Sequence, residues 1–198
     1  MSIFRRRLMM GEKNEEEIIL PEGYTRVEFI ETDGDPYINT NIKGTGTWVI
    51  DAQVNNQLSR SQILIGKTYD RGHWAGVVPN GKWGVNSSVY TSYDATMRTK
   101  MRIIFTLRKA TIVIGAESAS ITGGYDSNDY FWIFSCLQHG SFTIGAKLWR
   151  ATCVQDDIKV FDGIPSLDSN GKAGLFDLVS NTFKGNVGKG DFTYGQII

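Results

Sequence analysis

The sequence is poor in the residues and segments that mark several specialised classes of protein. Its 198 residues include two cysteines, two histidines and four prolines, and its 21 basic residues are balanced by 21 acidic ones. A balanced chain has no overall electric field that would attract nucleic acid or an anionic membrane. No apolar stretch approaches the ~20 residues that span a bilayer. We therefore expect no nucleic-acid partner and no membrane partner.

The two cysteines, Cys136 and Cys153, both stand in apolar runs typical of strands. Cysteine is among the most deeply buried residue types, so we expect both to be buried free thiols. A disulfide between them would need Cα atoms within about 7 Å, a distance that sequence spacing leaves open.

Metal ligands are also scarce. His73 and His139 are far apart in the sequence and no third ligand accompanies them, so a zinc site is not expected. The runs Asp156-Asp157 and Asp168-Ser169-Asn170-Gly171 offer oxygen ligands of the kind that calcium prefers. The second run is more simply interpreted as an Asx-type turn. We expect no metal and no cofactor.

Residues 1–19 differ from the rest of the chain. A secretory signal needs about 7–15 apolar residues after its basic segment. Here Arg5-Arg6-Arg7 is followed only by Leu8-Met9-Met10 before Gly11 and an acidic run. We therefore expect synthesis in a cytoplasm without a secretion signal.

In this short arm the basic and acidic residues stand in separate blocks, and so short a segment cannot bury enough surface to fold alone. It is interpreted either as a disordered tail or as an arm that orders on a partner. A helix over residues 3–10 would put Phe4 and Leu8 on one face. The docking residues would be Ile3, Phe4, Arg5, Arg6, Arg7, Leu8 and Met9.

The remainder, residues 20–198, is predicted to be one all-β domain. Twenty-two glycines and 12% aromatic residues suit short strands joined by tight turns. No window combines helical periodicity with helix caps, whereas two-residue alternation predicts about a dozen strands at roughly 8–12-residue spacing. Single strands are expected at 24–31, 37–40, 48–54, 62–66, 130–134, 142–146, 147–154 and 158–161. The pattern is typical of an antiparallel β-sandwich or jelly roll.

Two predicted hairpins support the same fold. One covers residues 72–85, where Asn80-Gly81 provides the positive φ values that a tight turn needs. The other covers residues 101–115, with its turn expected at Lys109-Ala110.

Two motifs frame this domain. The first begins with Leu20-Pro21-Glu22-Gly23-Tyr24 and extends to Tyr37-Ile38-Asn39-Thr40. The second begins at Ile144-Gly145-Ala146-Lys147-Leu148-Trp149, closes with Pro165 to Asp177 and continues through Asn186, Gly188 and Gly190. Together they resemble the concanavalin A-like lectin/glucanase (LamG-like) jelly-roll domain found in proteins of gut bacteria and their phages. The opening motif matches at Leu20, Pro21, Gly23, Tyr24, Glu28, Ile30, Glu31, Gly34, Tyr37, Ile38 and Thr40, with Phe29 in the aromatic slot. The resemblance covers residues 20–195 and implies the fold more strongly than the activity, because one fold serves many functions.

The first ten residues are similar to leaders on structural proteins of Bacteroides-infecting phages. With the jelly roll, this resemblance implies a non-enzymatic virion protein, a head attached through its arm to capsid or tail. Its role would be decoration, fibre formation or adhesion to host glycans, as a homo-oligomer, with a trimer favoured. The alternatives are a bacterial carbohydrate-binding module outside a virion and a sandwich-fold glycoside hydrolase.

The hydrolase alternative depends on carboxylates. Glucanases of this fold carry Glu-x-Asp-x-x-Glu on a strand, and retaining chemistry needs two carboxyls about 5–5.5 Å apart. Glu31 and Asp33 match the first half of this motif, but Pro36 replaces the final acid. We therefore expect no glycosidase activity.

Glycan binding depends on exposed aromatic rings with polar groups beside them. The richest segment lies around the first hairpin, with Tyr69, Asp70, Arg71, His73, Trp74, Trp83, Asn86, Tyr90 and Tyr93 as candidates. The competing interpretation is that Trp74 and Trp83 pair across the hairpin or fill the core. Trp48, Trp132 and Trp149 stand among alternating apolar residues and are predicted to lie in the core.

Overall fold

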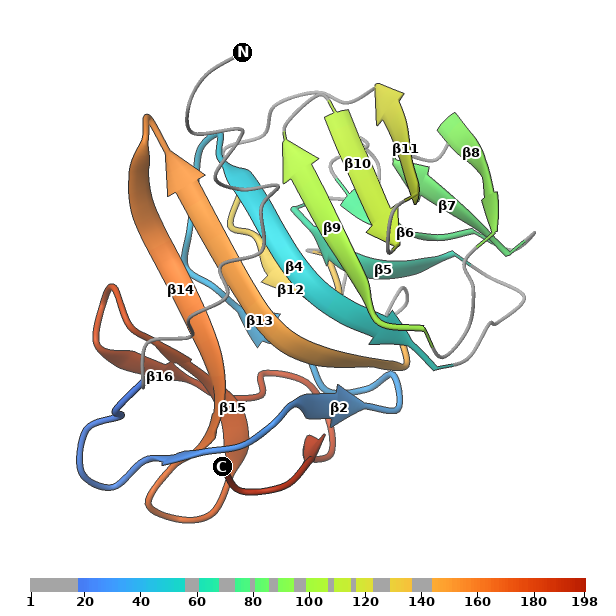
Figure 1. Ribbon diagram of the computed structural model, residues 1–198. Helices are drawn as coiled ribbons and strands as arrows, with labels where there is room; N and C mark the ends of the chain where they lie inside the picture. The colour runs from blue at the N-terminus through green and yellow to red at the C-terminus, as the bar shows by residue number, and fades with distance from the viewer. Residues whose placement is uncertain are drawn as a thin grey trace.

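The computed structural model describes residues 18–55, 61–67, 74–78, 81–85, 89–94, 99–106, 109–114, 117–122, 129–136 and 144–198. These residues contain seventeen strands and no helix. The strands form two antiparallel sheets, of eleven and six strands, with the larger sheet in front in Figure 1. The predicted all-β antiparallel sandwich is confirmed, while the jelly-roll connectivity stays a prediction.

The larger sheet is built around the two long strands β4 and β13. Its main path runs β11 (Glu117–Thr122), β10 (Lys109–Ile114), β9 (Met101–Thr106), β4 (Thr47–Val54), β13 (Ala146–Gln155), β14 (Ile158–Leu167), β15 (Ala173–Asp177) and β16 (Thr182–Lys184). Three short strands join it at the side: β1 (Thr25–Arg26) pairs with β14, and β2 (Ile30–Thr32) pairs with β13 and β17 (Thr193–Tyr194).

The smaller sheet lies behind the larger one in Figure 1. Its order is β3 (Ile38–Asn39), β12 (Trp132–Ile133), β5 (Gln62–Gly66), β6 (Trp74–Val77), β7 (Lys82–Val85) and β8 (Val89–Asp94). The hairpin of β6 and β7 is the one that the Asn-Gly pair predicts. Both sheets contribute side chains to one buried cluster, so their inner faces pack directly on each other.

Strict alternation of side chains produces this core. Every second residue of β4, from Trp48 to Val54, is buried, and β9 alternates in the same way. The ring of Trp48 packs against Phe131 at 5.2 Å and Phe161 at 5.4 Å between centroids. Trp48 is therefore a core residue, as predicted. Trp132 is half-buried, although its indole nitrogen is fully enclosed.

The two framing motifs meet in space. Thr25 of β1 pairs with Leu167 of β14, so the first framing motif is hydrogen-bonded to the second. The ring of Tyr24 lies 4.7 Å from that of Phe176 and 5.8 Å from that of Phe183, between ring centroids. Aromatic pairs at these separations add stability beyond their buried area.

The predicted strand at 24–31 is wrong in its extent. It is two strands, because the chain leaves β14 after Arg26 and joins β13 only at Ile30. Between them Val27 forms an isolated bridge with Ile197. Val27 and Ile30 are both buried although they are three residues apart, which breaks the two-residue period.

Three other boundaries differ from the prediction. The hairpin of β9 and β10 closes at Thr106 and Lys109, so Lys109 begins a strand and the connection is residues 107–108. The expected strand at 147–154 is β13, which begins at Ala146; residues 144–145 lie outside any strand, and residues 142–143 lie outside the described residues. The expected strand at 130–134 shrinks to β12, because Phe134 turns the chain with a φ of 66°.

Both cysteines are free and buried, as predicted. Burial raises the pKa of the Cys153 thiol to about 12 from an ordinary 9.0, although the charge of Lys67 acts in the opposite direction. The low dielectric of the core disfavours the thiolate. Cys153 is therefore an unreactive thiol in the folded protein.

This pKa shift predicts a loss of stability in alkali. The unfolded thiol ionises near pH 9.0, whereas the folded thiol keeps its proton until about pH 12. The contribution is complete below pH 9 and is lost as the pH rises towards 12. At about pH 10.5 we expect it to lower the unfolding free energy by about 2 kcal/mol, since one pKa unit is worth about 1.4 kcal/mol. Denaturant unfolding at two pH values should show this extra loss in the native chain but not in Cys153→Ala. Equal pH dependence of the two proteins would contradict it.

Candidate functional site

Two of the nine glycan residues predicted from the sequence, Trp74 and Trp83, have described side chains, and both lie in the core. Trp74 and Trp83 are both fully buried, Trp83 in the main core and Trp74 in a second cluster with Ile63, Val78 and Cys136. Neither ring has a face open to a sugar, and the core interpretation holds for both. Tyr90 and Tyr93 lie in β8, whose side chains are not described. Tyr69, Asp70, Arg71, His73 and Asn86 lie outside the described residues, as do the docking residues Ile3 to Met9.

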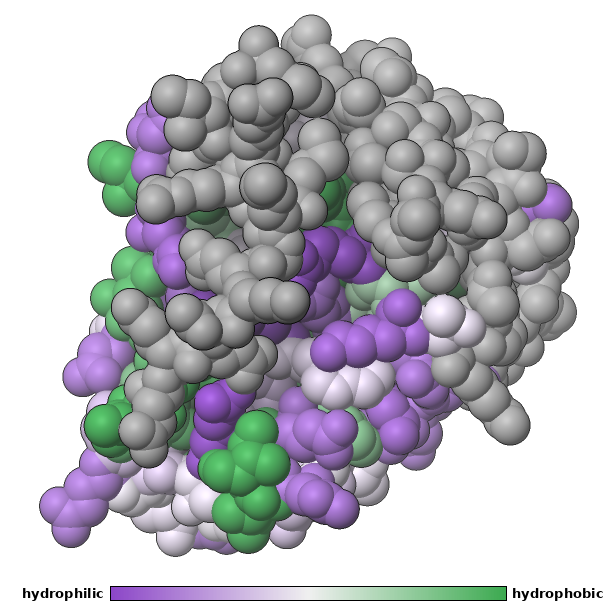
Figure 2. Space-filling model, in the orientation of Figure 1, coloured by the Kyte–Doolittle hydropathy of each residue, from purple (hydrophilic) through white to green (hydrophobic). Residues whose placement is uncertain are grey.

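A different surface gathers polar and aromatic side chains: the face of the larger sheet that points away from the core. Alternate residues of β4, β9 and β13 are only half-buried on this side. Hydrophilic side chains gather at the centre of this face in Figure 2, over β4 and β13. We name six contacting residues the outer-face cluster: Phe29, Glu31, Asn55, Lys100, Lys147 and Trp149.

An aromatic pair lies in this cluster. The rings of Phe29 and Trp149 are 5.5 Å apart between centroids and inclined by 57°. The prediction that Trp149 is a core residue is wrong, because β13 carries a bulge between Leu148 and Arg150. A bulge inserts one unpaired residue and changes the direction of the side chains around it. Trp149 is therefore half-buried on the outer face.

Two lysines lie over these rings. The Nζ atom of Lys147 is 4.2 Å from the centroid of Phe29, and that of Lys100 is 4.7 Å from the centroid of Trp149. Cation–π contacts at exposed sites are worth about 0.5–1 kcal/mol. They hold both ammonium groups beside the aromatic pair without neutralising their charge.

Glu31 is the carboxylate of the cluster, and its neighbours fix its position. Asn55 Nδ2 donates a hydrogen bond of 2.5 Å to Glu31 Oε1, while Lys147 Nζ lies 3.8 Å from Glu31 Oε2. Gln53 Nε2 in turn donates to Asn55 Oδ1 at 3.1 Å. Glu31 is thus positioned by an amide and a cation.

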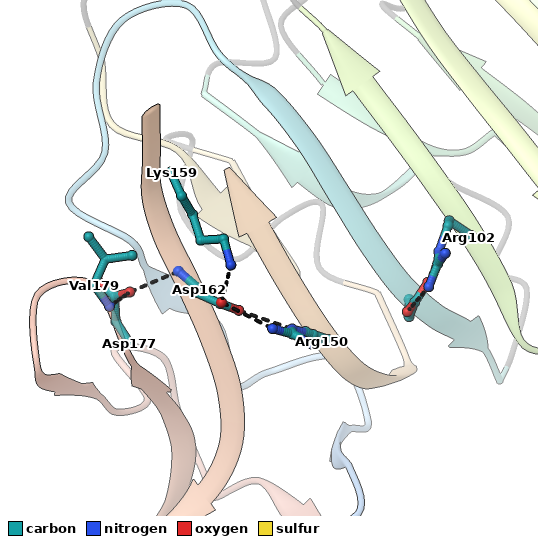
Figure 3. A network of polar contacts seen from close by, with 7 residues as sticks. Arg102, Arg150, Lys159, Asp162, Asp177 and Val179 are labelled. Atoms are coloured by element: carbon teal, nitrogen blue, oxygen red, sulfur yellow. Dashed lines mark hydrogen bonds and ion pairs between the residues drawn. The ribbon is translucent and has the colours of Figure 1, made fainter. Parts of the chain in front are cut away.

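The other carboxylates of this face are also paired with cations. Asp51 accepts two hydrogen bonds from Arg102, at 2.7 and 2.9 Å, and this bonding raises the pKa of Arg102. Asp162 is almost fully buried and is bound by Arg150 at 3.0 Å and by Lys159 at 2.7 Å. Figure 3 shows Arg150 and Lys159 converging on Asp162 from two strands.

Asp177 completes the group drawn in Figure 3. It is buried and accepts hydrogen bonds from the backbone N–H of Asp162, at 2.8 Å, and of Val179, at 3.1 Å. Ser180 Oγ donates to its second oxygen at 2.6 Å. Asp177 therefore holds the β15–β16 turn and the backbone that carries Asp162.

The runs considered as calcium ligands form turns. Asp156 and Asp157 have φ values of 47° and 64° between the paired residues Gln155 and Ile158. Two central residues with positive φ define the tight type I′ hairpin turn. Within the described residues, no group of three or more His, Cys, Asp or Glu side chains is placed to hold a metal ion. Nor does any helix there have the length and hydrophobicity to cross a membrane.

Asp168 is fixed by its own loop. Its Oδ1 atom accepts the backbone N–H groups of Lys172, at 2.8 Å, and Asn170, at 2.9 Å. The hydrogen bond from Lys172 is the largest cause that lowers the pKa of Asp168. This is the predicted Asx-type turn.

The close approach of Gly195 to Phe29 supports the aromatic pair. A Cβ atom at residue 195 would lie 2.7 Å from Phe29 Cε1, so only glycine fits without movement of the ring. We expect Gly195→Ala to lower the unfolding free energy by about 1–2 kcal/mol, since the ring must shift. Urea unfolding beside Gly185→Ala tests this, because a Cβ at residue 185 would come no closer than 3.4 Å to Phe183. Equal stability of the two variants would show that Phe29 is not held against Gly195.

No family model and no curated protein matches the sequence. The class that fold and surface define is an antiparallel β-sandwich with a polar and aromatic outer face. Four members of the cluster lie in the framing motifs, Phe29 and Glu31 in the first and Lys147 and Trp149 in the second, but the motifs do not mark them as a site. No local pattern marks Asn55 or Lys100.

Proposed function

We propose that this chain is a non-enzymatic structural protein of a bacteriophage particle, and that its lectin-like sandwich adheres to glycans on the host surface. The virion context is supported by the resemblance of the first ten residues and of the framing motifs to phage structural proteins. In this proposal residues 1–19 attach the sandwich to capsid or tail, and the particle displays it as a homo-oligomer, with a trimer favoured.

One observation carries the glycan-binding part: the Phe29–Trp149 pair on the outer face, with amides and ammonium groups beside it. Sugar sites combine apolar rings, which pack against the faces of pyranose rings, with a few polar groups that fix orientation. The outer-face cluster contains both kinds of group.

The carboxylates of the outer face already have hydrogen-bond or ion-pair partners, which supports a non-enzymatic role. A retaining glycosidase needs a carboxylate nucleophile and a second carboxyl that exchanges protons with the substrate. Glu31 is held by Asn55 and Lys147, while Asp51 and Asp162 are bound by arginines. Asp33 accepts a weak hydrogen bond from its own turn, and the position of the motif's final acid is Pro36.

Two experiments test the parts of this proposal separately. Particles assembled with a chain that lacks residues 1–19 should lose the protein, whereas incorporation at the native level would contradict the docking role. The full chain on a glycan array should bind above background, and Trp149→Ala should remove that binding without lowering the melting temperature by more than a few degrees. A sandwich that binds no glycan would leave only the structural role.

The second candidate function is a bacterial carbohydrate-binding module outside a virion. The same outer-face cluster favours it, because glycan binding does not depend on the particle. Glycan binding combined with absence from purified particles would favour this candidate over the virion protein.

A further inference from the structure

We infer that the outer-face cluster binds an acidic polysaccharide, whose anionic groups pair with Lys100 and Lys147 while a sugar ring packs beside Trp149. This inference rests on the proposed glycan-binding function and adds the charge class of the ligand. Three features of the surface support it: its net charge, the unused hydrogen-bonding capacity of its cations, and the position of the ammonium groups over the rings.

The outer-face cluster is more positive than the chain as a whole. The protein has equal numbers of basic and acidic residues. The cluster contains two ammonium groups, those of Lys100 and Lys147, and one carboxylate, that of Glu31. A surface with an excess of one sign attracts ligands of the other sign.

The excess charge is concentrated beside the aromatic pair. Asp51 is matched by Arg102, so that pair contributes no net charge. Lys100 contacts the ring of Trp149, and no carboxylate within the described ranges pairs with it. Lys147 is 3.8 Å from Glu31, longer than a hydrogen bond, and Glu31 already accepts one from Asn55. Each ammonium carries three donors, so both lysines can bind an added anion.

Trp149 can take part in the same contact. Its indole N–H accompanies a half-buried ring and, unlike that of Trp132, is not enclosed by the protein. An indole can pack its ring on a sugar while its N–H donates to a hydroxyl or a carboxylate. The bulge in β13 therefore presents a ring and a donor at the same position.

The position of the lysines distinguishes an acidic sugar from a neutral one. A neutral sugar that packs on the ring face covered by a lysine displaces that ammonium group, and its hydroxyls offer the ammonium only neutral acceptors. Ordinary hydrogen bonds then replace the lost cation–π contact. An acidic sugar draws the same ammonium towards its carboxylate or sulfate, and the flexible lysine stem allows that movement. The anionic ligand therefore gains an ion pair that the neutral ligand does not provide.

The test compares ligands that differ only in charge. The full chain is titrated calorimetrically with oligogalacturonate, with its carboxyl-reduced neutral counterpart, and with a sulfated chondroitin oligosaccharide. We expect at least one acidic oligomer to bind about tenfold more tightly than the neutral one, with an affinity that falls as salt rises. Stronger binding of the sulfated or of the carboxylated oligomer identifies which anionic group the site prefers.

Variants locate the binding. Lys100→Gln and Lys147→Gln should each weaken the acidic oligomer about threefold to fivefold, as expected for an exposed ion pair. Trp149→Ala should weaken it about tenfold or more, since tryptophan anchors dominate binding sites. Lys172→Gln is the matched control, because Lys172 is an exposed lysine that pairs with Asp191, and neither residue is a member of the outer-face cluster. Melting curves verify that each variant is folded.

The possible failures are distinguishable. Equal or tighter binding of the neutral oligomer would overturn the acidic ligand but leave the proposed glycan-binding function standing. Binding of an acidic oligomer that none of the three cluster variants weakens would overturn this site. Binding of no glycan, on the array or by calorimetry, would overturn the inference and the glycan-binding function together.

Discussion

Alanine in place of Gly76 is expected to destabilise the smaller sheet more than most single substitutions would. A Cβ atom at residue 76 would lie 2.0 Å from the carbonyl oxygen of Gln62 and 2.8 Å from the Cα of Ile63. Both atoms belong to the backbone of β5, so no side-chain rotation relieves the overlap. Glycine in a strand often marks such a close approach of another backbone.

The size of the effect follows from what must move. Overpacking costs about 1–3 kcal/mol where side chains can shift, and we expect more than about 3 kcal/mol here because two paired strands must separate. For a domain of this size that is about 6–12 °C in melting temperature. The pairing beside Gly76 already contains a register shift between Ile63 and Ile65, which leaves little freedom to adjust. Gly185→Ala is again the matched control, and a Gly76→Ala protein as stable as that control would mean that β5 and β6 pair differently.

The fold class could be predicted because the strands report it locally. In β4 every second residue is buried, and that alternation is visible in the sequence from Trp48 to Val54. The sequence does not predict strand boundaries where the chain passes from one neighbouring strand to another. Residues 25–32 have strand-like composition throughout, yet they pair first with β14 and then with β13. Local periodicity contains no information about which neighbour a strand joins.

The site was less predictable for two physical reasons. The sequence leaves Trp74 and Trp83 open between a sugar-binding surface and the core, because the sequence of a hairpin does not say whether a second layer covers it; in the structure both rings are buried. The sequence predicts a core position for Trp149, but Trp149 is the unpaired residue of the bulge in β13 and lies half-buried on the outer face. The outer-face cluster brings together residues from β2, β13 and the ends of β4 and β9. Its members are close only because the sheet orders these strands side by side.

Asn186→Ala is expected to lower the unfolding free energy by about 3 kcal/mol, because the Asn186 side chain links the first framing motif to the last loop. Asn186 Oδ1 accepts the backbone N–H groups of Tyr37, at 3.0 Å, and Gly188, at 2.7 Å, while Nδ2 donates to the carbonyls of Gly188 and Gly190, at 3.2 and 2.7 Å. Each such bond contributes about 0.5–1.5 kcal/mol, and partly buried backbone groups left without a partner add to the loss.

The side chain of Asn186 thus takes the place of strand pairing where the first framing motif meets the last loop. One direct backbone hydrogen bond lies beside it, from Val187 N to Tyr37 O at 2.9 Å. Asn39→Ala is the control, because Asn39 accepts a single hydrogen bond, from Asn41 N, at an exposed turn. We expect that control to lose no more than about 1 kcal/mol in denaturant unfolding. If Asn186→Ala lost as little, the β1–β14 pairing, the backbone bonds of Val187 to Tyr37 and of Val27 to Pro165, and the Tyr24 ring contacts would suffice to hold the two framing motifs together. The family resemblance at Asn186 would then have no structural basis in this loop.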